Sequence, residues 1–154
     1  MNFSVLMSIY KKEKPEYFSL CIKSLFEQSI IPTEIVIVKD GPLTEELDNI
    51  IDEYINKYPN ILKTVPLEIN QGLGKALAIG VENCSHELIA RMDTDDICAP
   101  DRFEIQLKEF EKNTDLDILG SCIIEFENTP NNVLSERNVP LEHNDIYNFA
   151  RKRR

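Results

Sequence analysis

The hydrophobic positions along the chain change repeatedly between two spacings. Residues 3–9 and 35–38 are continuous apolar runs, which are typical of strands buried on both faces. Between these runs, after Pro15, apolar residues recur at spacings of three and four, which predicts a helix. The interchange continues along the chain. We predict strands at 3–9, 35–38, 61–67, 86–92 and 118–126, and helices at 15–26, between Thr44 and Pro59, at 72–81 and at 99–110.

This order of elements predicts the fold class. Strands that alternate with helices form an open, mostly parallel, Rossmann-like α/β sheet with helices on both faces. We expect this domain to span residues 1–126 and a polar extension to follow at 127–154. In such sheets, ligands bind outside the carboxyl ends of the strands, near the point where the strand order reverses. Candidate functional residues are therefore the polar residues that follow predicted strands.

Charge and cysteine content narrow the class of partner. The chain has 27 acidic and 17 basic residues, a net charge of −10, and four of the basic residues are its last four. A body this acidic argues against binding to nucleic acid. Binding of phosphates would instead need a metal ion or oriented backbone groups. The four cysteines form no Cys-x-x-Cys pair, which favours a reducing, cytoplasmic compartment.

The segment 91–96, Arg-Met-Asp-Thr-Asp-Asp, is the most informative motif. Its carboxylates, Asp93, Asp95 and Asp96, directly follow a predicted strand and repel one another unless a cation or solvent separates them. Oxygen ligands of this kind suit Mn²⁺ or Mg²⁺, which would bridge the protein to substrate phosphates. The alternative interpretation is a solvated acidic turn or a helix N-cap ahead of Pro100.

Two further polar residues are candidates for nucleotide binding. Asp40 ends the second predicted strand and could accept a hydrogen bond from a nucleobase or a ribose, although Asp before Gly41 is also common in turns. Lys75 follows two glycines at a predicted helix start and could contact a diphosphate. The alternative is a solvated surface lysine. The spacing does not match a Walker phosphate loop.

Four ordered segments together resemble the nucleotide-binding half of family-2 inverting glycosyltransferases, which have the GT-A fold. They are residues 4–10, 34–41, 70–73 and 91–96, the last followed by Pro100 and Arg102. The run 91–96 is most similar to enzymes that build bacterial capsule, exopolysaccharide or O-antigen chains. The resemblance implies metal-dependent transfer of a sugar from a nucleotide-sugar, with UDP as the expected nucleotide, to a growing glycan or a lipid-linked sugar.

The resemblance also implies a role for each matching residue. Ser8 and Tyr10 would line the base and ribose pocket, Asp40 would hold the uracil, Asp95 would bind the metal, Asp93 would contact ribose or the metal, and Asp96 would support the sugar. Two positions depart from the family pattern: Lys39 replaces a second acid, and Leu77-Ala78 replaces an Arg-Asn pair.

The general base of the family comes from a later segment, so we expect no catalytic base within these 154 residues. Residues 127–154 would begin the acceptor-binding half. A non-catalytic nucleotide-sugar or metal-binding module is the alternative function. A phospho-receiver domain is excluded because Ser8 to Lys11 stand where its acidic pair would follow the first strand.

Two surface features predict further association. The apolar segment 118–126 would support a homodimer if it is exposed. The basic tail 151–154 has two interpretations: contact with phosphates or anionic lipid at the inner face of the membrane, or merely the point where a reading frame stops.

Overall fold

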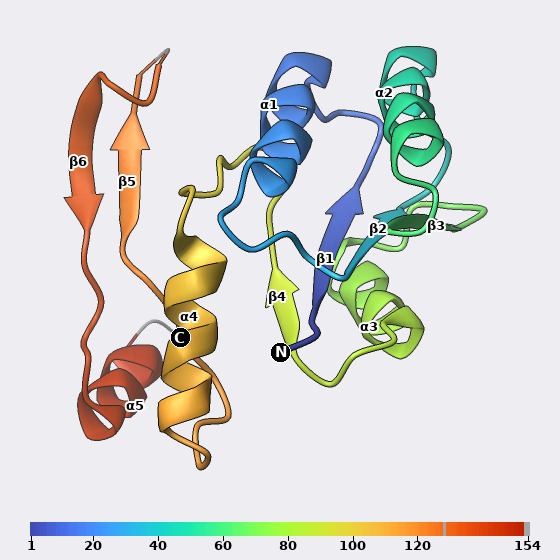
Figure 1. Cartoon of the computed structure of the whole chain (residues 1–154). Helices are drawn as coiled ribbons and strands as arrows, with labels where there is room; N and C mark the ends of the chain where they lie inside the picture. Colours follow the sequence, from blue (N-terminus) through green and yellow to red (C-terminus); the bar gives the residue numbers. More distant parts are fainter. Residues whose placement is uncertain (128, 153–154) are drawn as a thin grey trace. The chain divides into compact units, whose positions relative to one another are not determined.

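The computed structural model describes residues 1–127 and 129–152, and these form two compact units (Figure 1). The first unit is Met1–Lys112 and the second is Asn113–Arg154. Arg153 and Arg154 of the predicted basic tail lie outside the described residues. The predicted boundary after residue 126 divides a donor part from an acceptor part, and this functional division stays a prediction.

The first unit contains a parallel four-stranded sheet in the order β3-β2-β1-β4. Its strands are β1 (Ser4–Ile9), β2 (Glu34–Lys39), β3 (Leu62–Pro66) and β4 (Ile89–Arg91). The chain adds β2 and β3 on one side of β1 and then crosses to place β4 on the other side. The predicted α/β fold class is confirmed, and the strand order reverses beside β1.

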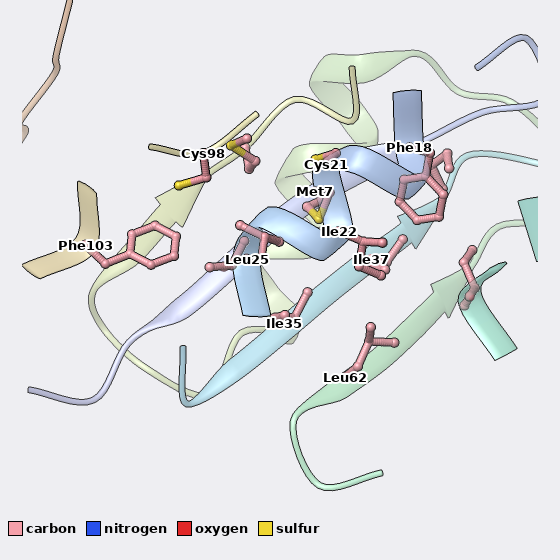
Figure 2. Close-up of a cluster of buried hydrophobic side chains, with 14 of the residues drawn as sticks. Met7, Phe18, Cys21, Ile22, Leu25, Ile35, Ile37, Leu62, Cys98 and Phe103 are labelled. Atoms are coloured by element: carbon pink, nitrogen blue, oxygen red, sulfur yellow. The ribbon is translucent and has the colours of Figure 1, made fainter. Parts of the chain in front are cut away.

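Helices cover both faces of the sheet because both faces are apolar. The helices are α1 (Pro15–Phe26), α2 (Glu45–Lys57), α3 (Leu73–Asn83) and α4 (Arg102–Lys112). Val5, Met7 and Ile9 of β1 belong to a large buried cluster together with residues of α1, α2 and α4 (Figure 2). Leu6 belongs to a smaller cluster with Ala76 of α3. Each fully buried side chain of this size stabilises the fold by roughly 1.5–3 kcal/mol.

The position of α3 depends on one close approach to the sheet. A Cβ atom built at Gly80 would lie 2.3 Å from Leu6 Cδ1 and 2.9 Å from Val38 Cγ2. A larger residue at Gly80 would require Leu6 and Val38 to repack or α3 to move away from β1 and β2. The absence of a side chain at Gly80 therefore permits the close packing of α3 on the sheet.

The second unit corrects one prediction. The strand predicted at 118–126 is β5 (Ile123–Phe126), and it pairs with β6 (Val133–Arg137) in an antiparallel sheet rather than joining the parallel sheet. The reason is the intervening turn, in which the Glu127 N–H donates to the Asn132 carbonyl at 3.0 Å. Helix α5 (His143–Lys152) follows. Within residues 1–127 and 129–152, no helix has the length and apolar character to cross a bilayer.

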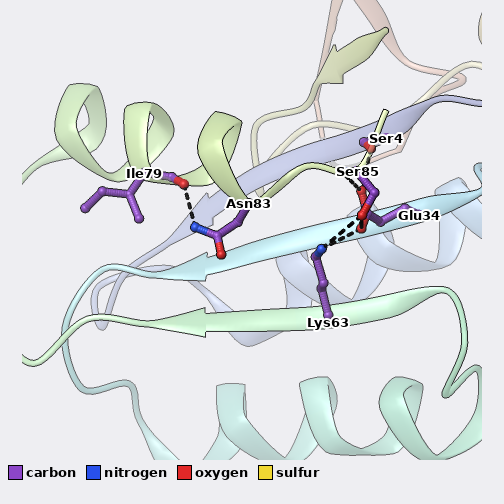
Figure 3. Close-up of polar contacts among 6 residues, drawn as sticks. All are labelled: Ser4, Glu34, Lys63, Ile79, Asn83 and Ser85. Atoms are coloured by element: carbon purple, nitrogen blue, oxygen red, sulfur yellow. Dashed lines mark hydrogen bonds and ion pairs between the residues drawn. The ribbon is translucent and has the colours of Figure 1, made fainter. Parts of the chain in front are cut away.

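A buried carboxylate joins the amino-terminal edge of the parallel sheet (Figure 3). Glu34 accepts hydrogen bonds from the Ser4 hydroxyl at 2.5 Å, the Ser85 N–H at 2.8 Å and the Ser85 hydroxyl at 2.7 Å. The Lys63 ammonium lies 2.6 Å from the same carboxylate. Burial would raise the pKa of Glu34, but these four contacts outweigh it and lower the pKa to about 2. Glu34 thus links β1, β2, β3 and the chain before β4.

We predict that Glu34 makes the fold sensitive to acid. Its pKa falls from 4.5 to about 2 on folding, so its stabilisation is complete above pH 4.5 and is lost as the pH falls through 2. The loss should be about 3 kcal/mol. Urea unfolding of wild type and Glu34→Gln at several values between pH 6 and pH 2.5 tests this. The wild type should lose its advantage over the variant in this range, and parallel pH profiles would contradict the prediction.

Candidate functional site

The carboxyl ends of β1, β2 and β4 bring the predicted site residues to one edge of the sheet. Ile9 pairs with Lys39, the Asp40 N–H donates to the Ile9 carbonyl at 2.8 Å, and the Met92 N–H donates to the Leu6 carbonyl at 3.0 Å. The chain after β2 and the chain after β4 therefore flank β1. This edge is where ligands bind in open parallel sheets, because there the loops of strands on either side of the reversal diverge.

The predicted base and ribose residues lie at the end of β1. Ser8 is half-buried within the strand, and Tyr10 is exposed directly after it. The ammonium of Lys39, the residue that departs from the family pattern, lies 2.5 Å from an Asp48 carboxylate oxygen on α2. This ion pair restricts the approach of the lysine side chain to the end of β1. The pairing with α2 accounts for a lysine at the last position of β2.

Asp40 is buried, and it holds the loop that precedes α3. Its two carboxylate oxygens accept the N–H of Gln71 at 2.6 Å and the N–H of Gly72 at 3.0 Å. The side-chain amide of Asn70 also donates to Asp40, at its backbone carbonyl, at 3.1 Å. Two motifs that look independent in the sequence, 40–41 and 70–72, are therefore partners. Asp40 therefore has a structural role in the chain turn, as the alternative interpretation proposed. Each of its two carboxylate oxygens still has a lone pair that a ligand could use.

Gly41 allows these two segments to approach. Its φ is +85°, and an added Cβ would lie 2.8 Å from the Asn70 nitrogen. Only glycine adopts this conformation readily and leaves this space. Lys75 follows in the first turn of α3, where it is exposed. It shares the carboxyl edge with Asp40, but no contact among the described residues joins it to the acidic segment.

The acidic segment 93–96 is tied to the chain around it. The buried Thr94 donates its hydroxyl to Glu13 at 2.5 Å, which joins the loop after β4 to the loop after β1. The Cys21 thiol of α1 donates to the Asp93 carbonyl at 3.2 Å. The Asp93 carboxylate pairs with the Arg91 guanidinium. Three contacts thus fix the start of the segment.

The charges of the segment act on one another and on α1. Partial desolvation and the negative charges of Asp95 and Asp93 raise the pKa of Asp96, against the opposing effect of Arg91 and Arg102. Burial raises the pKa of the Cys21 thiol, and the nearby carboxylates raise it further. Arg91 and Arg102 therefore compensate the negative charge of the acidic segment only in part, and the remaining charge favours a cation.

The fit to a divalent metal rests on Asp95. Its carboxylate is exposed, and no hydrogen bond or ion pair engages it anywhere in residues 1–127 and 129–152. The same residues contain no group of three or more His, Cys, Asp or Glu side chains arranged to hold a metal. Mg²⁺ and similar ions commonly bind through one or two carboxylates together with substrate phosphates, so the segment fits an ion shared with a substrate.

Arg102, at the start of α4, contacts the two residues that precede the acidic segment. Its guanidinium donates to the Arg91 carbonyl at 3.1 Å and lies 3.2 Å from the Met92 sulfur. Sequence reasoning assigned no role to Arg102, Glu13 or Thr94 in the site. The sequence shows only a threonine between two aspartates; the burial of Thr94, which requires its hydroxyl to have a partner, appears only in the structure.

Comparison with known proteins gives a consistent result. The sequence profile described as "Glycosyl transferase family 2" matches residues 4–154. Amylovoran biosynthesis glycosyltransferase AmsE of Erwinia amylovora is 46% identical over 149 residues, which are 97% of this chain and 54% of that protein. UDP-Gal:alpha-D-GlcNAc-diphosphoundecaprenol beta-1,3-galactosyltransferase of Escherichia coli is 40% identical over 152 residues, or 99% of this chain and 54% of that protein.

Solved structures agree with these relatives. The crystal structure of S. aureus TarS 1-349 in complex with UDP-GlcNAc matches with a TM-score of 0.63 and 28% identity. The match covers 73% of this chain and 32% of that one. The chain spans about half the length of the curated relatives it matches.

Alanine substitutions at Gly41 and Gly74 should have opposite effects on stability, because Gly41 lies in the contact between 40–41 and 70–72 and Gly74 lies outside it. Gly41→Ala should destabilise the protein by about 2 kcal/mol, because it adds a clash with Asn70 to a left-handed backbone. Gly74→Ala should stabilise it by about 0.5–1 kcal/mol, because Gly74 lies in α3 with nothing within 4 Å of an added Cβ. Urea unfolding of both variants measures the difference, and equal effects would contradict it.

Proposed function

Because the chain belongs to glycosyl transferase family 2, we propose that it forms the donor-binding part of an enzyme that transfers a sugar from a UDP-sugar to a glycan or lipid-linked acceptor. One observation carries the proposal. The segment 93–96 lies at the carboxyl edge of the sheet where the strand order reverses, and the Thr94–Glu13 hydrogen bond holds it beside the loop after β1.

In this proposal Asp95 holds a divalent ion, with Asp93 as a second contact. The unpaired, exposed carboxylate of Asp95 supports that assignment. Asp93 is already paired with Arg91, so it would bind a ribose hydroxyl or the ion through its remaining lone pairs. Asp96 would orient the sugar. When bound, Mn²⁺ or Mg²⁺ supplies positive charge that stabilises a departing nucleoside diphosphate.

The nucleotide would occupy the space between the ends of β1 and β2. Ser8 and Tyr10 would line the base and ribose pocket, and Asp40 would accept a hydrogen bond from the uracil. The carboxylate of Asp40 is held rigidly by Gln71 and Gly72, which supports a fixed acceptor for a base edge. Lys75, exposed at the start of α3, would contact the diphosphate.

The acceptor and the donor are proposed from the relatives. The E. coli relative is named for transfer from a UDP-sugar to a diphosphoundecaprenol-linked sugar, which supports a lipid-linked acceptor for this chain. The name of the Erwinia relative supports a role in exopolysaccharide synthesis. Homodimerisation through 118–126 and contact of the basic tail with anionic lipid stay predictions.

We predict metal-dependent binding of UDP that requires Asp95. Calorimetric titration of UDP into the 154-residue chain should give binding in the presence of Mn²⁺, and much weaker binding without it, because the ion bridges Asp95 to phosphate oxygens. Asp95→Asn should weaken binding at least tenfold. Asp52→Asn, on the exposed surface of α2, is the matched control and should bind as wild type. Equal binding by Asp95→Asn would rule out Asp95 as the ion ligand.

We also predict that donor binding and sugar transfer are separable. An inverting transfer needs a general base to take a proton from the acceptor hydroxyl. We place that base outside these 154 residues, so the purified chain should bind UDP-sugar without transferring the sugar. Incubation with labelled UDP-sugars and a lipid-linked acceptor, followed by chromatography of the lipid fraction, tests this. Repeated turnover by the 154-residue chain would contradict it.

A further inference from the structure

A stripe of three small or polar residues on α1 and its C-terminal end faces the chain around the acidic segment. Cys21 and Ser24 are three residues apart and share one face of α1, Gln28 follows two residues after the helix ends, and all three are buried. Buried polar side chains need hydrogen-bond partners. All of these residues find partners in the segment 93–103.

Ser24 bridges α1 and Cys98, which lies two residues after the acidic segment. Its hydroxyl oxygen accepts the Cys98 N–H at 3.0 Å and donates to the Cys21 carbonyl at 2.6 Å. A single hydroxyl therefore satisfies one backbone group on each side. The Cys98 amide is buried, so without Ser24 it would lose its partner.

The side-chain amide of Gln28 also bonds several backbone groups, all within residues 98–103. Its amide nitrogen donates to the Ala99 carbonyl at 2.7 Å and lies 3.3 Å from the Cys98 carbonyl, and its amide oxygen accepts the Phe103 N–H at 3.5 Å. The backbone adds another contact, since the Ser29 N–H donates to the Pro100 carbonyl at 2.8 Å. Residues 98–103 are thus fixed to the end of α1.

The acidic segment is consequently held at both ends. Cys21 and Glu13 fix Asp93 and Thr94, whereas Ser24 and Gln28 fix Cys98 and Ala99. Asp95 and Asp96 lie between these two attachments and are exposed. Because these two neighbouring carboxylates carry like charges, the attachments on either side hold them together against their mutual repulsion.

We propose that Ser24 and Gln28 are positioning residues for the metal and the donor: they touch neither ligand, but they fix the carboxylates of Asp95 and Asp96 for binding. The proposal rests on the proposed function of the acidic segment. Binding sites need their ligand groups held to within about 0.5 Å by surrounding hydrogen bonds, so release of Cys98 and Ala99 should weaken metal binding more than it weakens the fold.

The test compares buried hydrogen bonds at opposite edges of the sheet. Ser24→Ala and Gln28→Met remove the attachments of the acidic segment, and Met keeps most of the volume of Gln. Ser4→Ala is the matched control, because Ser4 is also buried and its hydroxyl donates to Glu34 at 2.5 Å at the amino-terminal edge. All three variants should lower the melting temperature to a similar extent.

The decisive measurement is the Mn²⁺ concentration that gives half-maximal UDP binding. We expect it to rise about tenfold in Ser24→Ala and Gln28→Met and to stay at the wild-type value in Ser4→Ala. Wild-type values in all three variants would overturn the proposal and leave the function standing. Failure of the wild type to bind UDP at any Mn²⁺ concentration would instead overturn the proposed function and this inference with it.

Amide exchange supplies a second readout that needs no ligand and serves if Gln28→Met does not fold. The Cys98 N–H donates to Ser24, so its exchange reports the attachment directly. Ser24→Ala should accelerate exchange in residues 95–98 by a larger factor than it accelerates exchange in β1, which reports only the loss of global stability. Unchanged protection at Cys98 in this variant would overturn the proposal.

Discussion

The structure depends on the burial of β1 on both faces and its pairing on both sides. Leu6 faces α3, whereas Val5 and Met7 face the opposite cluster, and β2 and β4 occupy the two edges. A strand in this position has no freedom to shift, because a slip of one residue would exchange its two apolar faces. The loops that leave β1, β2 and β4 therefore emerge at one fixed edge, and the polar residues in them are held close together.

Both edges of the sheet use buried polar groups, but with different consequences. Glu34 at the amino-terminal edge has every partner it needs, including a lysine, so its charge is balanced. At the carboxyl edge the hydrogen bonds of Thr94 and Ser24 fix the backbone and leave Asp95 unpaired. A balanced carboxylate stabilises a fold, and an unbalanced one is available for a ligand.

The sequence predicts the elements of the first unit well because each is marked by local signals. Pro15 begins α1, and Thr44 caps α2 by accepting the Leu47 N–H at 3.4 Å. Continuous apolar runs mark β1 and β2. It does not reveal the partnership of Asp40 with Gln71 and Gly72, because the two segments are thirty residues apart and meet only in the folded sheet. Hydrogen bonds from side chains to a distant backbone leave no periodic pattern.

In the second unit the sequence predicts a strand correctly but not the strand with which it pairs. Residues 118–126 have the apolar composition of a core strand, yet Ile123 and Ile124 are exposed within a two-stranded sheet. Composition specifies that a segment is extended, but pairing depends on the connection that follows it. After β4, residues 93–101 lead into α4 and remain in the parallel sheet's unit, whereas after β5 the turn that ends with Asn132 reverses the chain. The polar loop at 93–101 could be predicted as a candidate site because an apolar strand precedes it, and the same reasoning misplaced β5 because its partner lies after it.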